Sequence, residues 1–293
     1  MRKLLPAAIA VLAAAGCTPA QAPAPALSQD GTCRRIVALT VGSVDTLALL
    51  GALDRIVAVE EDCFVPGTEG KVRILNDDHA GPSRALNVEA ILALGADAVV
   101  AKTDLKPALE GKGLRVIWVP SAMRLDDIPP MVTALGDLVG APERARGLVA
   151  ELEATRAELE RMTAHLPGVR VYTEAGQQGR SSGKGTLMDA LIRLAGGVNI
   201  AGGQDLATPV LTSEAIVAAD PEVILLSPWS SSPEEVGARP GWNRISAVRN
   251  GRVHRLPERD RRLMYPSPSC IDGCRRMLLP WIHPEFAAAA EKR

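Results

Sequence analysis

NVEAILALGADAVVA at residues 87–101 returns, with changes, as TSEAIVAADPEVILL at residues 212–226. In each copy a polar residue precedes a short helical stretch, a glutamate (Glu89 or Glu214) stands in the first turn, and an acidic turn leads into an apolar β run. Two copies are too few for a repeat array, which needs at least about three units. The duplication instead predicts two related lobes, each with a helix followed by a buried strand.

The composition is that of a globular protein with aliphatic cores. The chain has 293 residues, 47% of them hydrophobic, which is enough for two modest cores. The chain has 33 Lys and Arg residues and 34 Asp and Glu residues, which gives a net charge of -1. The sequence therefore lacks the basic excess that is typical of nucleic-acid binding. Aromatic residues make up only 3% of the chain.

The N-terminus has the features of an export signal. A basic pair precedes an apolar stretch, residues 4–15, that is too short to cross a bilayer as a mature helix. Small residues then lead to Cys17, as in the lipidation signal of bacterial lipoproteins; the alternative is an ordinary secretory signal with an incidental cysteine. We predict a signal peptide over residues 1–16 and a lipid anchor with a disordered tether over residues 17–33. Both readings place the protein in the periplasm or at the cell surface.

Apolar runs alternate with helical patterns along the rest of the chain. The predicted strands cover residues 35–40, 55–59, 98–101, 114–119, 169–173, 223–226 and 252–256. This alternation predicts an α/β fold of two Rossmann-like lobes with mostly parallel sheets. Residues 60–84 are expected to form one long polar loop, and residues 269–282 a final helix.

One long helix is predicted between the lobes. Apolar residues recur at three and four residues through residues 141–167, and about 25 residues at about 1.5 Å each give a rod of about 37 Å. The N-terminal lobe would then span residues 34–140 and the C-terminal lobe residues 168–293. A single rigid connector of this kind permits only small hinge motions, so we expect a cleft between two lobes that move little.

Several further segments carry a family resemblance through their order and spacing. They are residues 35–39, 86–91, 96–97, 183–186, 194–200, 240–242, 247–253, 267–268 and 283–285. Together they resemble the periplasmic binding proteins of ABC importers for iron–siderophore, haem and cobalamin, over nearly all of residues 34–286. The resemblance implies two α/β lobes joined by one long helix, a ligand in the cleft between them, and no intrinsic cofactor.

The resemblance also implies a role for the two duplicated glutamates. Family members carry one glutamate on each lobe that docks onto arginines of the ABC permease subunits in the inner membrane, at the positions of Glu89 and Glu214. Each stands in the first turn of a predicted helix, where the helix dipole favours an acidic group. The alternative is that each glutamate merely caps its helix. A matched pair at a fixed separation favours docking, because two charge contacts select an orientation.

Candidate ligand contacts follow the carboxyl ends of the predicted strands, where ligands gather in α/β lobes. They are Cys63, Phe64, Asp78, His79, Trp229, Arg261, Arg262, Met264 and Tyr265. Arginine suits carboxylate or catecholate groups, while Trp, Tyr and His suit planar rings. The basic stretch at residues 259–262 is equally consistent with a solvated loop.

Four cysteines follow the predicted anchor, and export makes disulfides possible in three pairings. Cys33 and Cys63 would lie at opposite ends of neighbouring strands, about 20 Å apart and beyond the bridging limit of about 7 Å. Cys270 and Cys274 are four residues apart on a helix, a spacing that suits metal better than a relaxed disulfide. Cys63, His79, Cys270 and Cys274 could therefore hold a metal or metal chelate, although separate structural thiols are the favoured interpretation.

We therefore expect a solute-binding component of an ABC importer that is not an enzyme. It would capture a metal chelate of the cobalamin, ferric siderophore or haem class, deliver it to the permease, and stay on the membrane through the lipid at Cys17. Three alternatives stay open. The protein could be a chelatase-like or metal-handling protein that uses the Cys/His set, or a sensor that presents ligand to a receptor. It could also be a serine hydrolase using Ser181 of G-x-S-x-G, although that serine does not directly follow a predicted strand.

Overall fold

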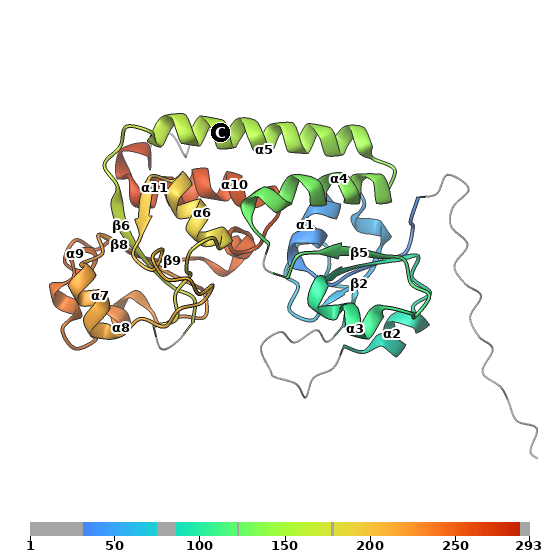
Figure 1. Ribbon diagram of the computed structural model, residues 1–293, viewed down its shortest axis with the longest axis horizontal. Coiled ribbons are helices and arrows are strands. Elements are labelled where there is room, and N and C mark those ends of the chain that lie inside the picture. Colours follow the sequence, from blue (N-terminus) through green and yellow to red (C-terminus); the bar gives the residue numbers. More distant parts are fainter. Residues whose placement is uncertain (1–31, 75–85, 122, 177–178, 288–293) are drawn as a thin grey trace, which may run out of the picture.

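The computed structural model describes residues 32–74, 86–121, 123–176 and 179–287. These residues form two separate sheets, each flanked by helices, and one long helix runs along the same side of both (Figure 1). All strand pairs within the two sheets are parallel. The predicted α/β class with two Rossmann-like lobes and mostly parallel sheets is therefore confirmed.

The sheet of the N-terminal lobe has the order β3-β2-β1-β4-β5. Its strands are β1 (Ile36–Ala38), β2 (Ile56–Glu60), β3 (Val72–Ile74), β4 (Ala98–Lys102) and β5 (Val116–Val119). Its helices are α1 (Val41–Leu49), α2 (Val88–Ala93), α3 (Lys106–Leu109) and α4 (Ile128–Leu138). Strand β1 is buried on both faces, as expected of a continuous apolar run inside a parallel sheet.

Strand β3 corrects one prediction, because it lies within the stretch that was expected to be a single polar loop. Val72 and Arg73 are exposed and only Ile74 is buried. Strand β3 pairs with β2 at the edge of the sheet. An edge strand with one buried residue has no apolar run, so hydrophobic patterning alone does not reveal it.

The sheet of the C-terminal lobe has the order β7-β6-β8-β9. Its strands are β6 (Val169–Glu174), β7 (Gly197–Asn199), β8 (Val223–Leu226) and β9 (Val253–Arg255). Its helices are α6 (Leu187–Leu194), α7 (Ser213–Ala219), α8 (Pro233–Gly237), α9 (Ser246–Arg249), α10 (Ser269–Gly273) and α11 (Leu279–Ile282). Strand β7 was not predicted, because it has three residues and begins with a glycine.

The duplicated stretch forms α2 with β4 in one lobe and α7 with β8 in the other. Asn87 accepts a hydrogen bond from the Ala90 N–H at 2.9 Å, and Thr212 accepts one from the Ala215 N–H at 3.2 Å. These two polar residues are the N-caps of their helices. The predicted pattern of cap, short helix, turn and buried strand is confirmed in both copies.

The final helix has the predicted extent but contains one π-helical turn, over Cys274–Leu278, between α10 and α11. Pro280 follows that turn and has no N–H to donate to the carbonyl four residues before it. The wider turn accommodates this missing bond.

Helix α5 (Pro142–Thr163) connects the lobes. Its 22 residues at about 1.5 Å each give about 33 Å, slightly less than the helix predicted over residues 141–167. Helix α5 lies along α4 of the first lobe and along α10 of the second (Figure 1). Among the described residues, no helix combines the length and the apolarity that crossing a membrane requires.

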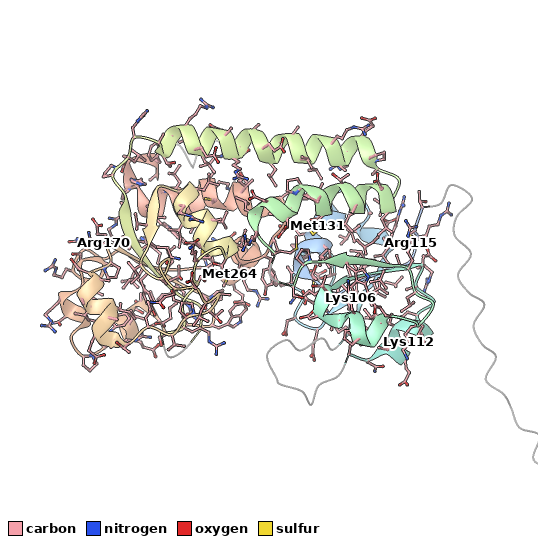
Figure 2. The ribbon with its side chains drawn as sticks, in the orientation of Figure 1. Lys106, Lys112, Arg115, Met131, Arg170 and Met264 are labelled. Carbon is pink, nitrogen blue, oxygen red and sulfur yellow. The ribbon has the colours of Figure 1, made fainter. Side chains whose placement is uncertain are left out.

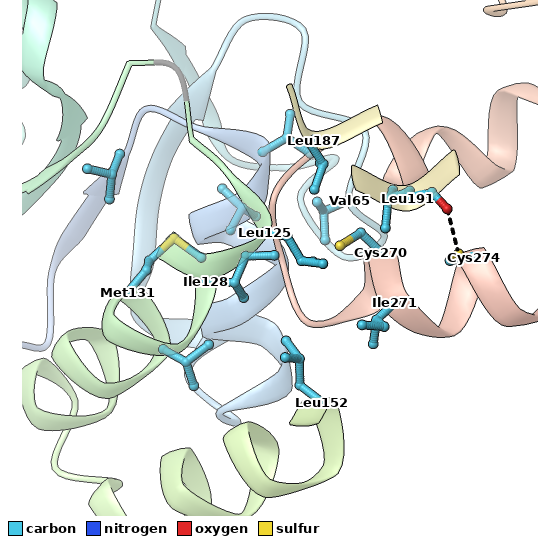
Figure 3. Close-up of a cluster of buried hydrophobic side chains, with 14 of the residues drawn as sticks. Val65, Leu125, Ile128, Met131, Leu152, Leu187, Leu191, Cys270, Ile271 and Cys274 are labelled. Carbon is cyan, nitrogen blue, oxygen red and sulfur yellow. Dashed lines mark hydrogen bonds between the residues drawn. The ribbon is translucent and has the colours of Figure 1, made fainter. Parts of the chain in front are cut away.

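One hydrophobic core continues from lobe to lobe beneath α5. Figure 3 shows Leu125 and Ile128 of the N-terminal lobe near Leu187 and Leu191 of α6, with Leu152 of α5 on the same cluster. These side chains are all buried. A close-packed interior has low compressibility and does not deform gradually. The shared core therefore supports the expectation that the lobes move little relative to each other.

Candidate functional site

Side chains from both lobes meet at the carboxyl ends of the two sheets. Phe64 follows β2, Trp229 follows β8 and Arg261 follows β9. The Arg261 guanidinium carbon lies 4.0 Å from the Phe64 ring centroid and 5.6 Å from that of Trp229. Three residues predicted as ligand contacts are thus brought together across the lobe boundary.

Tyr265 extends this group, which we call the cross-lobe cluster: Phe64, Trp229, Arg261 and Tyr265. The Tyr265 and Phe64 ring centroids are 5.4 Å apart, with the rings tilted by 54°. Burial, and next the negative charge of Glu60, raise the pKa of Tyr265 to about 12. The phenol is therefore protonated at neutral pH and offers a hydrogen-bond donor beside an aromatic surface.

The Arg261 guanidinium is largely buried but only partly satisfied. Its side chain is 14% exposed, and Nη1 forms an ion pair with Glu258 Oε1 at 2.8 Å. The buried Nε–H has no hydrogen-bond partner among the described residues. A buried donor without a partner is unfavourable by about 1–3 kcal/mol, so this position suits an additional acceptor.

Trp229 supplies an exposed apolar surface to the cluster. Its side chain is 48% exposed, which is unusual for so large a hydrophobic residue.

Met264 lies on the side of the C-terminal lobe that faces the other lobe (Figure 2). It lines a small apolar cavity of about 30 Å³ together with Thr173, Ser227 and Trp281. This cavity has room for a methyl-sized group or one water beside the cluster.

The remaining predicted contacts are not part of the described cluster. Asp78 and His79 lie outside the described residues, as does the side chain of Arg262. Cys63 is buried, with its sulfur 3.9 Å from Thr68 Oγ1. Burial raises the pKa of the Cys63 thiol. Their contact with ligand stays a prediction.

The four described cysteines are free and buried, so none of the three possible disulfide pairings is present among them. Cys274 donates a hydrogen bond to the Leu191 carbonyl at 3.4 Å (Figure 3). Burial raises the pKa of Cys270 to about 12 and also raises the pKa of Cys274. In the absence of a metal these thiols are therefore protonated and unreactive.

The metal site predicted at Cys63, His79, Cys270 and Cys274 gains no support from these observations. Within the ranges that the structure describes, no three His, Cys, Asp or Glu residues gather as metal ligands would. His79 lies outside those ranges. Separate structural thiols, the favoured interpretation, agree with the burial of all the described cysteines.

Glu89 and Glu214 occupy matching places at the starts of α2 and α7, and both are exposed. Helices α2 and α7 lie at the side of the molecule opposite α5, one on each lobe (Figure 1). Asn87 and Thr212, not the glutamates, cap these helices through their side chains. Among the described residues, neither glutamate side chain has a hydrogen-bond or ion-pair partner. Both carboxylates are therefore available to an external group.

The nucleophile elbow of a hydrolase is absent at Ser181. Its hydroxyl is buried and lies 3.0 Å from Thr173 Oγ1. Its N–H donates to the Pro209 carbonyl at 2.8 Å, next to a short antiparallel bridge between Arg180 and Val210. An elbow requires an exposed serine on a sharp turn from a strand into a helix, so this serine cannot act as one.

Sequence analysis missed two acidic residues near the cluster. Glu60 ends β2, and its charge raises the pKa values of Tyr265 and Cys63. Glu258 forms the ion pair with Arg261. A carboxylate at or just beyond the end of a predicted strand is the signal that could have indicated both.

A larger groove, of about 670 Å³, lies along α5 and shares no residue with the cross-lobe cluster. Leu148 and Glu151 of α5 line one side, and Pro257, Asp272 and Arg276 are among the residues on the other. Its lining mixes acidic, basic and apolar side chains, and none of the unpartnered buried polar atoms among the described residues belongs to it. The cluster at the strand ends is therefore the better candidate for the functional site.

Two lobes with strand ends and cross-lobe side chains at one boundary define a bilobal α/β binding protein. The profile of the family described as "Periplasmic binding protein" matches residues 36–259, and the chain belongs to that family. The resemblance inferred from the sequence is thereby confirmed.

Individual relatives are more distant. A cobalamin-binding protein of Halobacterium salinarum is 27% identical over 209 residues, which cover 68% of this chain and 55% of the relative. The crystal structure of the periplasmic vitamin B12-binding protein of Vibrio cholerae has a TM-score of 0.70 at 21% identity and covers 89% of this chain and 99% of that one. An apo periplasmic haem-binding protein of Roseiflexus sp. RS-1 has a TM-score of 0.71 at 21% identity, covering 88% of this chain and 99% of that one. The match thus spans about half the length of the Halobacterium salinarum relative, and the structures show a shared fold.

Proposed function

We propose that the protein is the solute-binding component of an ABC importer and that it captures a metal chelate between its lobes. The observation that carries this proposal is the cross-lobe cluster. Phe64 from one lobe and Trp229 from the other flank the cationic Arg261 at the strand ends. Aromatic faces and a buried guanidinium with an unpaired Nε–H suit a large ring system that carries acidic or amide side groups.

Cobalamin is the first candidate within this ligand class. The relative from Halobacterium salinarum is named as a cobalamin-binding protein, and this chain resembles it over 68% of its own length. Haem is the second candidate, since the tilted Phe64 and Tyr265 rings offer a surface for a planar macrocycle.

The colour of the natural ligand tests this assignment. The protein should be purified from its own host without denaturation, and its optical and mass spectra recorded. A corrinoid or haem spectrum that co-purifies at near-equimolar ratio is the expected result. A colourless protein whose mass spectrum shows a metal-free ligand would refute capture of a metal chelate.

We further propose that Glu89 and Glu214 dock the loaded protein onto the permease. The support is their placement: each is exposed at the start of an equivalent helix, one per lobe, on the side opposite α5 (Figure 1). Because Asn87 and Thr212 already cap the helices, capping does not account for the glutamates. Two carboxylates held on lobes that share one core keep a fixed separation, which selects the orientation of docking.

The double substitution Glu89→Ala with Glu214→Ala tests docking. Uptake should be measured in host cells that lack the native chain and express the variant, with ligand affinity measured separately on purified protein. We expect uptake to be lost while affinity stays within about twofold of wild type. Glu153→Ala with Glu234→Ala, which removes exposed glutamates elsewhere, should transport normally. A double variant that loses ligand affinity would contradict the docking role.

Export and anchoring at Cys17 belong to the same proposal, although residues 1–31 lie outside the described part. A lipid at Cys17 would hold the lobes near the importer. Cys17→Ser should move the protein from the membrane fraction to the soluble periplasmic or culture fraction. An unchanged distribution of this variant would refute the anchor.

A further inference from the structure

A buried charge network begins at the carboxyl end of β6. Glu174, the last residue of that strand, has a fully buried side chain. Arg239 donates from Nη1 to Glu174 Oε2 at 2.6 Å and from Nη2 to Oε1 at 2.8 Å. The Tyr172 hydroxyl donates to Oε2 at 3.1 Å, and burial raises the pKa of that hydroxyl, so it remains a donor. The carboxylate is therefore fixed by three hydrogen bonds.

The network continues through Trp242, which belongs to the Pro240–Trp242 segment noted in the sequence for its family resemblance alone. The Arg239 guanidinium carbon lies 4.6 Å from the Trp242 ring centroid. The Trp242 and Tyr172 rings make an edge-to-face contact with centroids 6.0 Å apart. Trp242 is buried, and its indole Nε1–H donates to Ser213 Oγ at 2.5 Å. Ser213 is the first residue of α7, directly before Glu214.

Ser246, four residues after Trp242, contacts the other end of α7. Asp220 follows the helix with a left-handed φ of 42°. Its carboxylate accepts from the Ser246 N–H at 2.7 Å and from the Ser246 hydroxyl at 2.8 Å. Trp242 and Ser246 therefore contact the two ends of one seven-residue helix. So short a helix has little intrinsic stability, and its orientation depends on such tertiary contacts.

We propose that Arg239 and Trp242 are positioning residues for docking, which set the orientation of α7, and hence of Glu214, relative to the ligand-facing end of β6. The inference rests on the proposed docking role of Glu214. The guanidinium is rigid and planar, and its two bonds to Glu174 fix both its place and its tilt. The Trp242 ring packs against this guanidinium and donates its indole N–H to Ser213, so the position of Arg239 fixes the position of Ser213. Glu174 also lines the small cavity beside Met264, so the network joins the cleft side of the lobe to the docking side.

A purely structural role is the competing explanation, since Trp242 is also part of the core beneath α7. The two roles differ at Ser213, which is exposed and whose loss does not disturb the core. Ser213→Ala removes the acceptor for the indole N–H and leaves the ring in place. Ser213→Thr restores a hydroxyl at the same position and serves as the conservative rescue.

The experiment measures association of the purified chain with right-side-out membrane vesicles from its own host. Every protein carries Cys17→Ser, so that the proposed lipid does not itself hold the chain on the membrane. The variants are Ser213→Ala, Ser213→Thr and Trp242→Phe, with Glu214→Ala as the positive control. Ser232→Ala is the matched negative control, because Ser232 caps α8 in the same lobe but lies outside the network. Hydrogen exchange of the α7 amides and the urea midpoint are recorded for each variant.

We expect Ser213→Ala and Trp242→Phe to weaken vesicle binding about three- to tenfold, the range that one net hydrogen bond supports. Ser213→Thr and Ser232→Ala should bind as wild type. The Ser213→Ala protein should stay folded, with a urea midpoint lowered by no more than one unpaired buried donor accounts for, while its α7 amides exchange faster. If Ser213→Ala binds as wild type and Glu214→Ala does not, the positioning role is wrong and docking stands. If Glu214→Ala also binds as wild type, docking fails and the positioning role fails with it.

Discussion

Removal of Arg239 gives the sharpest stability prediction, because it leaves the Glu174 carboxylate buried without its cation. Arg239→Met keeps most of the aliphatic stem but removes both hydrogen bonds to Glu174. Breaking a buried pair by removing one partner costs about 3–5 kcal/mol. The Arg239 side chain is 25% exposed, which places the expected value near the lower end, about 3 kcal/mol. The lost stacking on Trp242 adds about 0.5–1 kcal/mol.

Urea unfolding followed by far-ultraviolet circular dichroism measures this change. A loss of about 3–4 kcal/mol corresponds to a Tm decrease on the order of 10 °C for a chain of this size. Glu174→Leu combined with Arg239→Met also removes the buried carboxylate that the single variant leaves unpaired. The double variant should recover at least half of the lost free energy of unfolding. Arg146→Met is the matched control, since its ion pair with Glu143 is exposed and should contribute less than about 0.5 kcal/mol.

A loss of less than about 1 kcal/mol in Arg239→Met, the value typical of an exposed ion pair, would contradict a buried charge pair. So would a double variant that is as unstable as the single variant. The first result would mean that water reaches the Glu174 carboxylate, and the second that the loss comes from packing rather than from charge.

Three further predictions concern the rest of the chain. Burial, and next the charge of Arg252, lower the pKa of His254 in the folded state below 6.5. The unfolded chain therefore binds the proton first, and the free energy of unfolding should fall as pH decreases below about 6.5. His254→Gln should flatten this pH dependence in urea titrations, and an unchanged dependence of stability on pH would contradict the prediction. Cys270 and Cys274 should react with a thiol reagent only after unfolding, because burial raises the pKa of both thiols; labelling of the native protein would count against this burial. Gly42→Ala would bring a Cβ to 2.2 Å from the Pro266 carbonyl oxygen. We therefore expect the free energy of unfolding to fall by about 1–3 kcal/mol. An unchanged stability would show that the backbone at Pro266 moves aside freely.

The sequence patterns predicted the elements that rest on continuous apolar runs or on helical periodicity. Strands β1, β2, β4 and β8 each have adjacent buried residues. Helix α5 was predicted from its period instead, and its buried residues Ala145, Leu152 and Leu159 stand seven apart. Strands β3 and β7 have three residues each, with exposed positions, and their pairing depends on neighbours far along the chain. Local patterning carries no information about such pairing, which is why these strands were missed.

The candidate site was predictable in part for a topological reason. Phe64, Trp229 and Arg261 each follow the carboxyl end of a parallel strand, and parallel strands bring those ends to one edge. The sequence could not show that Cys63 is buried in the core while its neighbour Phe64 contacts Arg261. The directions of these two side chains depend on the backbone conformation of the loop after β2. Nor could it pair Glu174 with an arginine 65 residues away.

Titration with metal chelates tests the central claim, capture of a chelate at the cross-lobe cluster, most directly. The purified protein should be freed of ligand and titrated with cyanocobalamin, haemin and a ferric hydroxamate in an isothermal calorimeter. Wild type and Trp229→Ala are compared, with Trp118→Ala in the other lobe as the control. The account predicts that one of the three binds at one-to-one stoichiometry with a Kd below about 1 µM, with cyanocobalamin first in order of expectation. It also predicts at least tenfold weaker binding to Trp229→Ala alone. Absence of binding by all three chelates, or equal binding by all three proteins, would contradict it.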